Sequence, residues 1–131
     1  MIGLDTNVLV RYIVQDDPKQ SAKAAQLIES AARRDDDLFV GPVMLCELIW
    51  VLESAYEFPR AEIGNVVQQM LETEHLEIEP RDLTWQALAD YRSIPADFAD
   101  CLLGRMNQSA GCDTTVTFDR ALKPLSTFRI L

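Results

Sequence analysis

Apolar residues recur along the chain at two spacings, which predict short strands alternating with helices. Compact apolar runs that end at polar or turn-forming residues predict buried strands over residues 2–4, 38–40, 76–79, 114–118 and 128–131. Apolar positions three and four residues apart predict helices over residues 8–14, 18–34, 43–56, 60–74, 83–94 and 98–110. Connections of this length between strands imply right-handed crossovers. We therefore expect an α/β fold, a three-layer α/β/α sandwich around a central, mainly parallel sheet.

Local signals place the ends of two of these helices. Asp17 followed by Pro18 is typical of a helix start, with the aspartate as cap and the proline in the first turn. Gly111 is expected to end the last long helix, because glycine readily adopts the left-handed conformation found there.

The length and composition fit one globular domain. The chain has 131 residues, of which 48% are hydrophobic and 25% charged, and we expect residues 1–131 to form a single domain. Three cysteines without close pairing predict reduced core thiols of a cytoplasmic protein, and the single histidine makes a His/Cys zinc site untenable. We expect neither a secretion signal nor a membrane span.

The charge excludes one class of nucleic-acid binder. A net charge of -9 has the wrong sign for a protein that holds DNA or RNA by bulk electrostatics. Residues 101–131 nevertheless carry more basic than acidic side chains, including Arg105, Arg120 and Lys123. A local basic rim beside an acidic pocket is therefore compatible with the sequence.

Acidic residues stand where a parallel sheet presents its ligand site. Asp5 and Asp119 each end a predicted strand, and ligands of open parallel sheets bind beyond the strands' carboxyl ends. Glu47 lies in an otherwise apolar helix, where a buried carboxylate would need a cation. The alternative for Glu47 is a structural ion pair, for which Arg11 and a few more distant bases are available. The alternative for Asp5 and Asp119 is an ordinary role as turn former or helix cap, which is common for an aspartate at a strand end.

A fourth acid begins the last long helix. Asp100 lies in the first turn of this helix, where it can point toward the strand ends. A role as helix cap is enough to explain Asp97, which precedes it. Asp5, Glu47, Asp100 and Asp119 together form an oxygen-only ligand set, which suits one or two Mg²⁺ or Mn²⁺ ions. Polar neighbours are expected to support these ligands, namely Thr6, Asn7 and Thr117.

The chain resembles the PIN-domain ribonucleases, and within them the VapC-like toxins of bacterial toxin–antitoxin pairs. The resemblance covers nearly the whole chain. It rests on the run Asp5-Thr6-Asn7-Val8-Leu9, on Glu47 within Leu45-Cys46-Glu47-Leu48, on Asp97-Phe98-Ala99-Asp100, and on Thr117-Phe118-Asp119.

This resemblance implies an activity and partners. The four acids would hold the divalent ions for endonucleolytic cleavage of a tRNA or ribosomal RNA, with Asp97 and Thr117 in support and Arg105, Arg120 and Lys123 as candidate RNA contacts. A small cognate antitoxin would neutralise the enzyme. Surplus apolar side chains on the long helices predict a homodimer and an antitoxin groove, at Trp50, Tyr56, Val66 and Met70.

Three other functions compete with this interpretation. A haloacid-dehalogenase-type phosphatase needs a second aspartate two residues after the first, where this chain has Asn7. A receiver domain needs paired acids after its first strand; Lys123 is available as its lysine, but Leu4 precedes Asp5. A non-catalytic module, in which the acids only bind an arginine of a partner, would bind metal without turnover.

Overall fold

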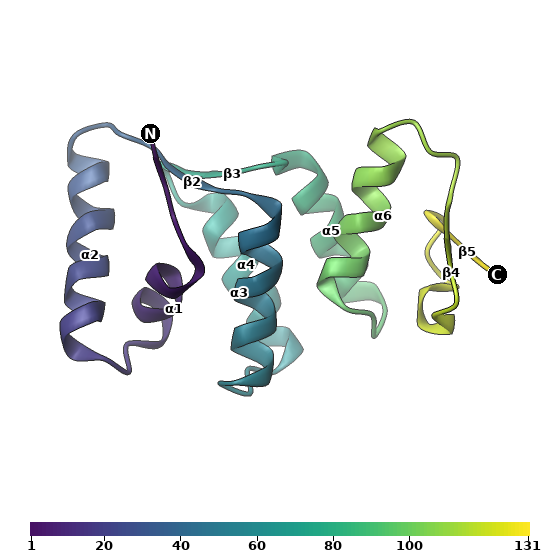
Figure 1. Cartoon of the computed structure of the whole chain (residues 1–131), viewed down its shortest axis with the longest axis horizontal. Helices are drawn as coiled ribbons and strands as arrows, with labels where there is room; N and C mark the ends of the chain where they lie inside the picture. Colours follow the sequence, from purple (N-terminus) through teal and green to yellow (C-terminus); the bar gives the residue numbers. More distant parts are fainter. The chain divides into compact units, whose positions relative to one another are not determined.

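The computed structural model describes residues Met1–Leu131 (Figure 1). It divides into two compact units, Met1–Arg81 and Asp82–Leu131. All the strands pair in parallel, three of them in the first unit and two in the second. The predicted α/β class with a parallel sheet is confirmed, and the strands form two hydrogen-bonded sheets, one in each unit.

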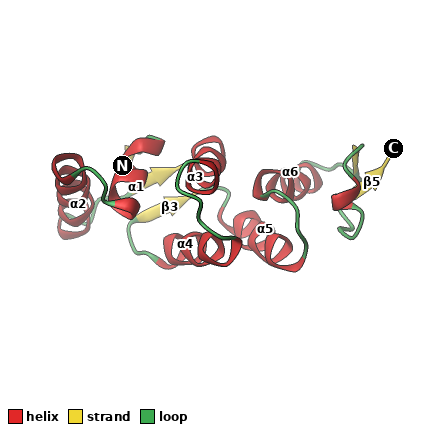
Figure 2. Ribbon diagram, turned by 90° about the horizontal axis from the view of Figure 1, so that it is seen from below, coloured by secondary structure: helices red, strands yellow, loops and turns green.

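The first unit is built around a three-stranded sheet in the order β1-β2-β3. Its elements, in chain order, are β1 (Ile2–Gly3), α1 (Thr6–Val14), α2 (Pro18–Arg33), β2 (Leu38–Val40), α3 (Pro42–Ser54), α4 (Arg60–Glu72) and β3 (Leu76–Ile78). Figure 2 shows α3 on one side of these strands and α4 on the other. In the register, Ile2 lies opposite Leu38 and Leu38 opposite Leu76, so apolar side chains are neighbours across the sheet.

The core of this unit is aliphatic. Strands β2 and β3 bury both of their outer residues, while α3 and α4 each turn a leucine- or isoleucine-rich face inward. The fully buried side chains include Val40, Leu45, Leu48, Leu52, Ile63, Val67, Leu71 and Ile78. Each such side chain contributes about 1.5–3 kcal/mol relative to its exposed state, so these contacts hold the helices against the strands.

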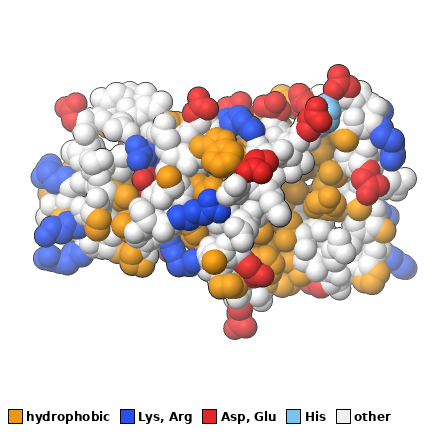
Figure 3. Space-filling model, turned by 180° about the vertical axis from the view of Figure 1, so that it is seen from behind, with side chains coloured by type: hydrophobic (Ala, Val, Ile, Leu, Met, Phe, Trp, Pro, Cys, Tyr) orange, Lys and Arg blue, Asp and Glu red, His pale blue; other side chains and the backbone are white.

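A hollow of about 640 Å³ remains in the first unit between α2 and α4, with α1 contributing one wall. We call it the α2–α4 groove; Figure 3 shows hydrophobic side chains gathered in it. Its apolar lining includes Leu9, Tyr12, Ile13, Ile28, Val66 and Met70. Acidic residues stand at its edge, namely Glu29, Glu72 and Glu74. The groove is thus apolar inside and acidic at the rim.

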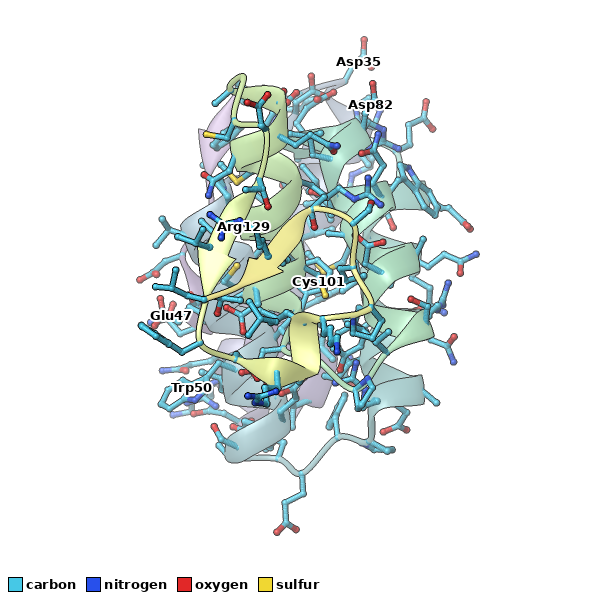
Figure 4. The ribbon with its side chains drawn as sticks, turned by 90° about the vertical axis from the view of Figure 1, so that its right-hand side faces the viewer. Asp35, Glu47, Trp50, Asp82, Cys101 and Arg129 are labelled. Carbon is cyan, nitrogen blue, oxygen red and sulfur yellow. The ribbon has the colours of Figure 1, made fainter.

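The second unit contains α5 (Arg81–Ser93), α6 (Phe98–Ser109), β4 (Thr115–Thr117), the 3₁₀ helix η1 (Arg120–Leu122) and β5 (Phe128–Ile130). Strands β4 and β5 pair in parallel with Thr115 opposite Phe128, and Figure 4 shows Arg129 on this pair and Cys101 on α6 behind it. Tyr91 and Phe98 pack edge to face with ring centroids 5.7 Å apart.

Helices α5 and α6 are also joined by charge. Arg105 binds Asp90 through two hydrogen bonds, of 2.7 Å from Nε and 2.9 Å from Nη2. This forked geometry is the strongest that an arginine makes with a carboxylate. The bond to Asp90 keeps the pKa of Arg105 above its ordinary value.

The helix boundaries agree closely with the sequence pattern. Asp17 caps α2 as predicted, since its side chain accepts a hydrogen bond from Gln20 N and Pro18 begins the helix. Helix α1 begins at Thr6 rather than at residue 8, because Asp5 supplies the cap. No helix has both the length and the apolar character needed to cross a membrane.

The prediction for the cysteines is only partly right. All three are free thiols, but only Cys101 is buried, whereas Cys46 is half-buried and Cys112 is exposed. Cys112 lies in the turn after α6, directly behind Gly111 with its positive φ of 102°. A turn of this kind projects its side chains toward solvent, which periodicity within the helix does not reveal.

Gly104 lies close to β5 and generates a stability prediction. A Cβ atom at this position would lie 2.6 Å from Cε2 of Phe128 and 2.8 Å from Oγ1 of Thr127. We expect Gly104→Ala to lower the free energy of unfolding by about 1–3 kcal/mol, because β5 must move away from α6. Chemical denaturation measures this. Gly3→Ala is the control, since nothing lies within 4 Å of its added Cβ; equal effects of the two substitutions would contradict the proposed clash.

Candidate functional site

Asp5 lies where the chain leaves β1 and enters α1. Its backbone is extended, with φ of -91° and ψ of 158°, and its side chain accepts a hydrogen bond of 2.7 Å from Thr6 N. Beside it is a pocket of about 260 Å³ that we call the acid pocket. The pocket is lined by Asp5, Thr6, Asn7, Val10, Arg11, Glu47, Val51 and Tyr56. Two of the four predicted ligands, Asp5 and Glu47, therefore line one pocket in the first unit.

Thr6 adds an unusual feature to this pocket. The residue is only 6% exposed, and its Oγ1 has no hydrogen-bond partner. A buried hydroxyl without a partner costs free energy, and in native proteins such atoms commonly mark a position that a bound group completes. Together with the two carboxylates, this hydroxyl makes an oxygen-rich set that fits Mg²⁺ or Mn²⁺.

Glu47 is exposed, which corrects the sequence-based argument for it. The apolar residues around it on α3 do not bury it, because Val43 is 82% and Trp50 is 67% exposed. Figure 4 shows Glu47 and Trp50 on the same side of α3. Glu47 forms no ion pair, and the expected partner Arg11 binds Asp16 instead. Glu47 thus remains available in the acid pocket, but burial is not the reason it would bind a cation.

The second unit gathers three more acids. Asp97 occupies the cap position of α6, yet its side chain makes no capping hydrogen bond, so the capping role expected for it is not realised. Asp100 lies in the first turn of α6. Asp119 caps η1 by accepting from Ala121 N at 3.0 Å, and Asp119 N donates to Thr117 Oγ1 at 3.0 Å. Thr117 thus contacts the backbone of Asp119, and its supporting role at the site stays a prediction.

These three acids affect one another electrostatically. Burial raises the pKa of Asp100 above its ordinary value, and the negative charges of Asp97 and Asp119 raise it further. Like charges that raise a pKa favour any cation that binds among them. The acids thus form two groups, one in each unit, and neither unit holds three or more ligands arranged to bind a metal ion by themselves. A site shared by all four predicted acids stays a prediction.

The basic candidates differ in their surroundings. Arg105 is bound to Asp90, so an RNA phosphate would have to compete with that pair. Arg120 and Lys123 are exposed on η1 and directly after it, close in sequence to Asp119.

A polar cluster that sequence reasoning missed lies beside the acid pocket, since Arg11 and Tyr56 are among its lining residues. Arg11 donates to Asp16 Oδ1 at 3.0 Å, and Tyr56 donates to Asp16 Oδ2 at 2.8 Å. The Tyr56 bond, with Arg11 nearby, lowers the pKa of Asp16. Asp16 and Tyr56 are 40 residues apart, and no sequence motif links them.

Comparisons with known proteins agree with the resemblance seen in the sequence. The chain matches the family described as "PIN domain" over residues 2–126. It is 29% identical over 122 residues to a protein of Aquifex aeolicus (strain VF5) named "VapC ribonuclease", covering 93% of this chain and 90% of the relative. These matches favour the nuclease interpretation over the phosphatase and receiver-domain alternatives.

The raised pKa of Asp100 predicts a pH-dependent effect on stability. The folded protein holds this proton more tightly than the unfolded chain, so the stability it contributes is present at acid pH and is lost as the pH rises through the folded pKa. At pH 7, without divalent ions, Asp100→Asn should raise the melting temperature by a few degrees, and the gain should shrink toward pH 4. Thermal unfolding in a chelating buffer measures this.

Asp113→Asn, which removes an exposed acid of the same unit, is the matched control. The rise in melting temperature for Asp100→Asn could instead be the same at both pH values, or Asp113→Asn could reproduce it. Either result would show that the folded structure does not disfavour the ionised form of Asp100.

Proposed function

The chain belongs to the PIN-domain family, and on that premise we propose that it is a VapC-like toxin, an endoribonuclease that depends on Mg²⁺ or Mn²⁺ and cuts structured RNA such as tRNA or ribosomal RNA. The observation that carries the proposal is the acid pocket, where Asp5 and Glu47 present carboxylate oxygens and the buried hydroxyl of Thr6 has no hydrogen-bond partner. The similarity to a VapC ribonuclease over most of the chain supports the same activity.

We propose that residues 1–131 act as one nuclease domain and that its metal ligands are the four acids predicted from the sequence. Asp5 and Glu47, which line the acid pocket, are two of these proposed ligands. Asp100 and Asp119 are the other two, with Asp97 and Thr117 proposed in support. A divalent ion held by these carboxylates supplies the Lewis acidity that phosphodiester hydrolysis requires. Asn7 and Thr6 orient the groups around it.

The net charge is compatible with an RNA substrate. The carboxylates repel a phosphate backbone in the absence of metal, and bound cations reverse the local sign. Arg120 and Lys123 then provide backbone contacts near Asp119, which position RNA without reading its sequence.

We further propose that the cognate antitoxin occupies the α2–α4 groove. The apolar lining suits the apolar face of an amphipathic segment, and the acids Glu29, Glu72 and Glu74 at the rim suit basic residues that flank it. Val66 and Met70, two of the residues expected at an interface, line this groove. Tyr56 does not; it lines the acid pocket instead, and its hydroxyl donates to Asp16.

A homodimer stays a prediction of the sequence. The apolar surface available for it in the first unit includes Val43 and Trp50 on α3, both well exposed. Analytical ultracentrifugation of the protein without antitoxin distinguishes one protomer from two.

The nuclease is tested by incubating antitoxin-free protein with tRNA and ribosomal RNA, with Mg²⁺ or Mn²⁺ and with a chelator. Discrete fragments should appear only with metal, and Asp5→Asn should reduce their rate of formation at least about a hundredfold, because a ligand oxygen is lost. Asp113→Asn, with the same change of charge at an exposed position, should cut as the parent does. Cleavage that persists in chelator or in Asp5→Asn would refute the proposed site, and metal binding without cleavage would support the non-catalytic module.

The antitoxin groove makes a separate prediction. Ile28→Glu places a charge in the groove lining and should weaken copurification of the co-expressed antitoxin at least about tenfold, while RNA cleavage by the free toxin is unchanged. Ala22→Glu, an exposed position of α2 outside the groove, is the control. Full antitoxin binding by Ile28→Glu would exclude this groove as the docking site.

A further inference from the structure

A second pocket of the first unit has the opposite charge character to the acid pocket. It lies between α1 and α2 and encloses about 290 Å³. We call it the α1–α2 pocket; it is lined by Asn7, Val8, Arg11, Gln20, Lys23, Ala24 and Leu27. Two of these side chains are basic, two are amides and none is acidic, in a chain whose net charge is -9.

Arg11 is held in a fixed orientation at this pocket. Its Nε donates to Gln20 Oε1 at 2.6 Å, and its Nη1 donates to Asp16 Oδ1 at 3.0 Å and to Tyr56 OH at 3.4 Å. The remaining nitrogen, Nη2, makes no hydrogen bond within the protein. Because Asp16 balances the charge of Arg11, the net positive charge of the pocket comes from Lys23.

The two pockets are neighbours. Asn7 and Arg11 line both of them, so the two pockets adjoin along α1. A nucleic-acid backbone carries one phosphate per nucleotide, and a nuclease must hold the phosphates beside the bond that it cuts as well as that bond itself.

We propose that the α1–α2 pocket binds a backbone phosphate of the RNA, next to the phosphodiester at the acid pocket. This inference rests on the proposed nuclease function and adds a substrate subsite to it. The Nη2 of Arg11 and the ammonium of Lys23 donate to the phosphate oxygens, with the amides of Asn7 and Gln20 beside them. The apolar side chains of Val8, Ala24 and Leu27 provide a surface for the ribose.

Lys23 is the residue to test, because it makes no ion pair and its loss leaves the Arg11 cluster intact. The probe is a fluorescein-labelled single-stranded RNA of mixed sequence, and the readout is fluorescence anisotropy with Asp5→Asn protein over a series of salt concentrations. Adding Lys23→Gln should weaken binding about tenfold and reduce the salt slope by about 0.7, the value for one lost phosphate contact on a single strand. Lys23→Arg should retain most of the affinity.

Lys19→Gln is the matched control, one turn earlier on α2 with the same change of charge and outside the pocket. It should change the affinity less than twofold. Equal effects of Lys19→Gln and Lys23→Gln would overturn the subsite while leaving the nuclease standing if the parent cuts RNA. Binding that depends on Lys23 in a protein that never cuts would retain the subsite and overturn the nuclease. A parent that does not bind RNA would overturn both, and Lys23-dependent binding of a poly-glutamate peptide but not of RNA would reassign the pocket to an acidic protein.

Discussion

The parallel pairing of β1 with β2 is the constraint on which the first unit depends. Leu4 N donates to Phe39 O at 3.0 Å, which keeps the ends of these two strands level. Since parallel strands end at the same edge, the chain enters α1 at Asp5 and α3 at Pro42 side by side. Glu47, about one and a half turns into α3, can therefore line the same pocket as Asp5 although 42 positions separate them along the chain. The pairing of β1 with β2 therefore determines that residues at the starts of α1 and α3 share one pocket.

Much of the fold could be predicted from the sequence because its signals are local. The apolar runs at Leu38–Val40 and Leu76–Ile78 and the cap at Asp17 need only their immediate neighbours to be recognised. The exposure of Glu47 could not be predicted, because it depends on which face of α3 meets the core. On a helix with apolar residues all round, periodicity does not distinguish the two faces.

The site was predictable in its residue types and less so in its contacts. Asp5, Thr6 and Asn7 form a contiguous run whose position at a strand end carries the information. Tyr56 and Lys23 gave no such signal, since their roles come from α3 ending near the α1–α2 turn and from α1 packing on α2. The acids of the second unit also conflict with local stability: Asp100 is half-buried beside Asp97 and Asp119, an arrangement that folding alone would not favour. Such conflicts are typical of residues retained for binding rather than for packing.

Helix α1 and the residue before it show how densely a short segment can be used. Every residue from Asp5 to Ile13 lines the acid pocket, the α1–α2 pocket or the α2–α4 groove. The different faces of this helix of two and a half turns thus line different cavities. Each of these residues therefore has a side chain at one or two of them. Tolerance to substitution should therefore be lowest in this segment. Substitutions should accumulate instead where side chains have few contacts, as on the exposed face of α2.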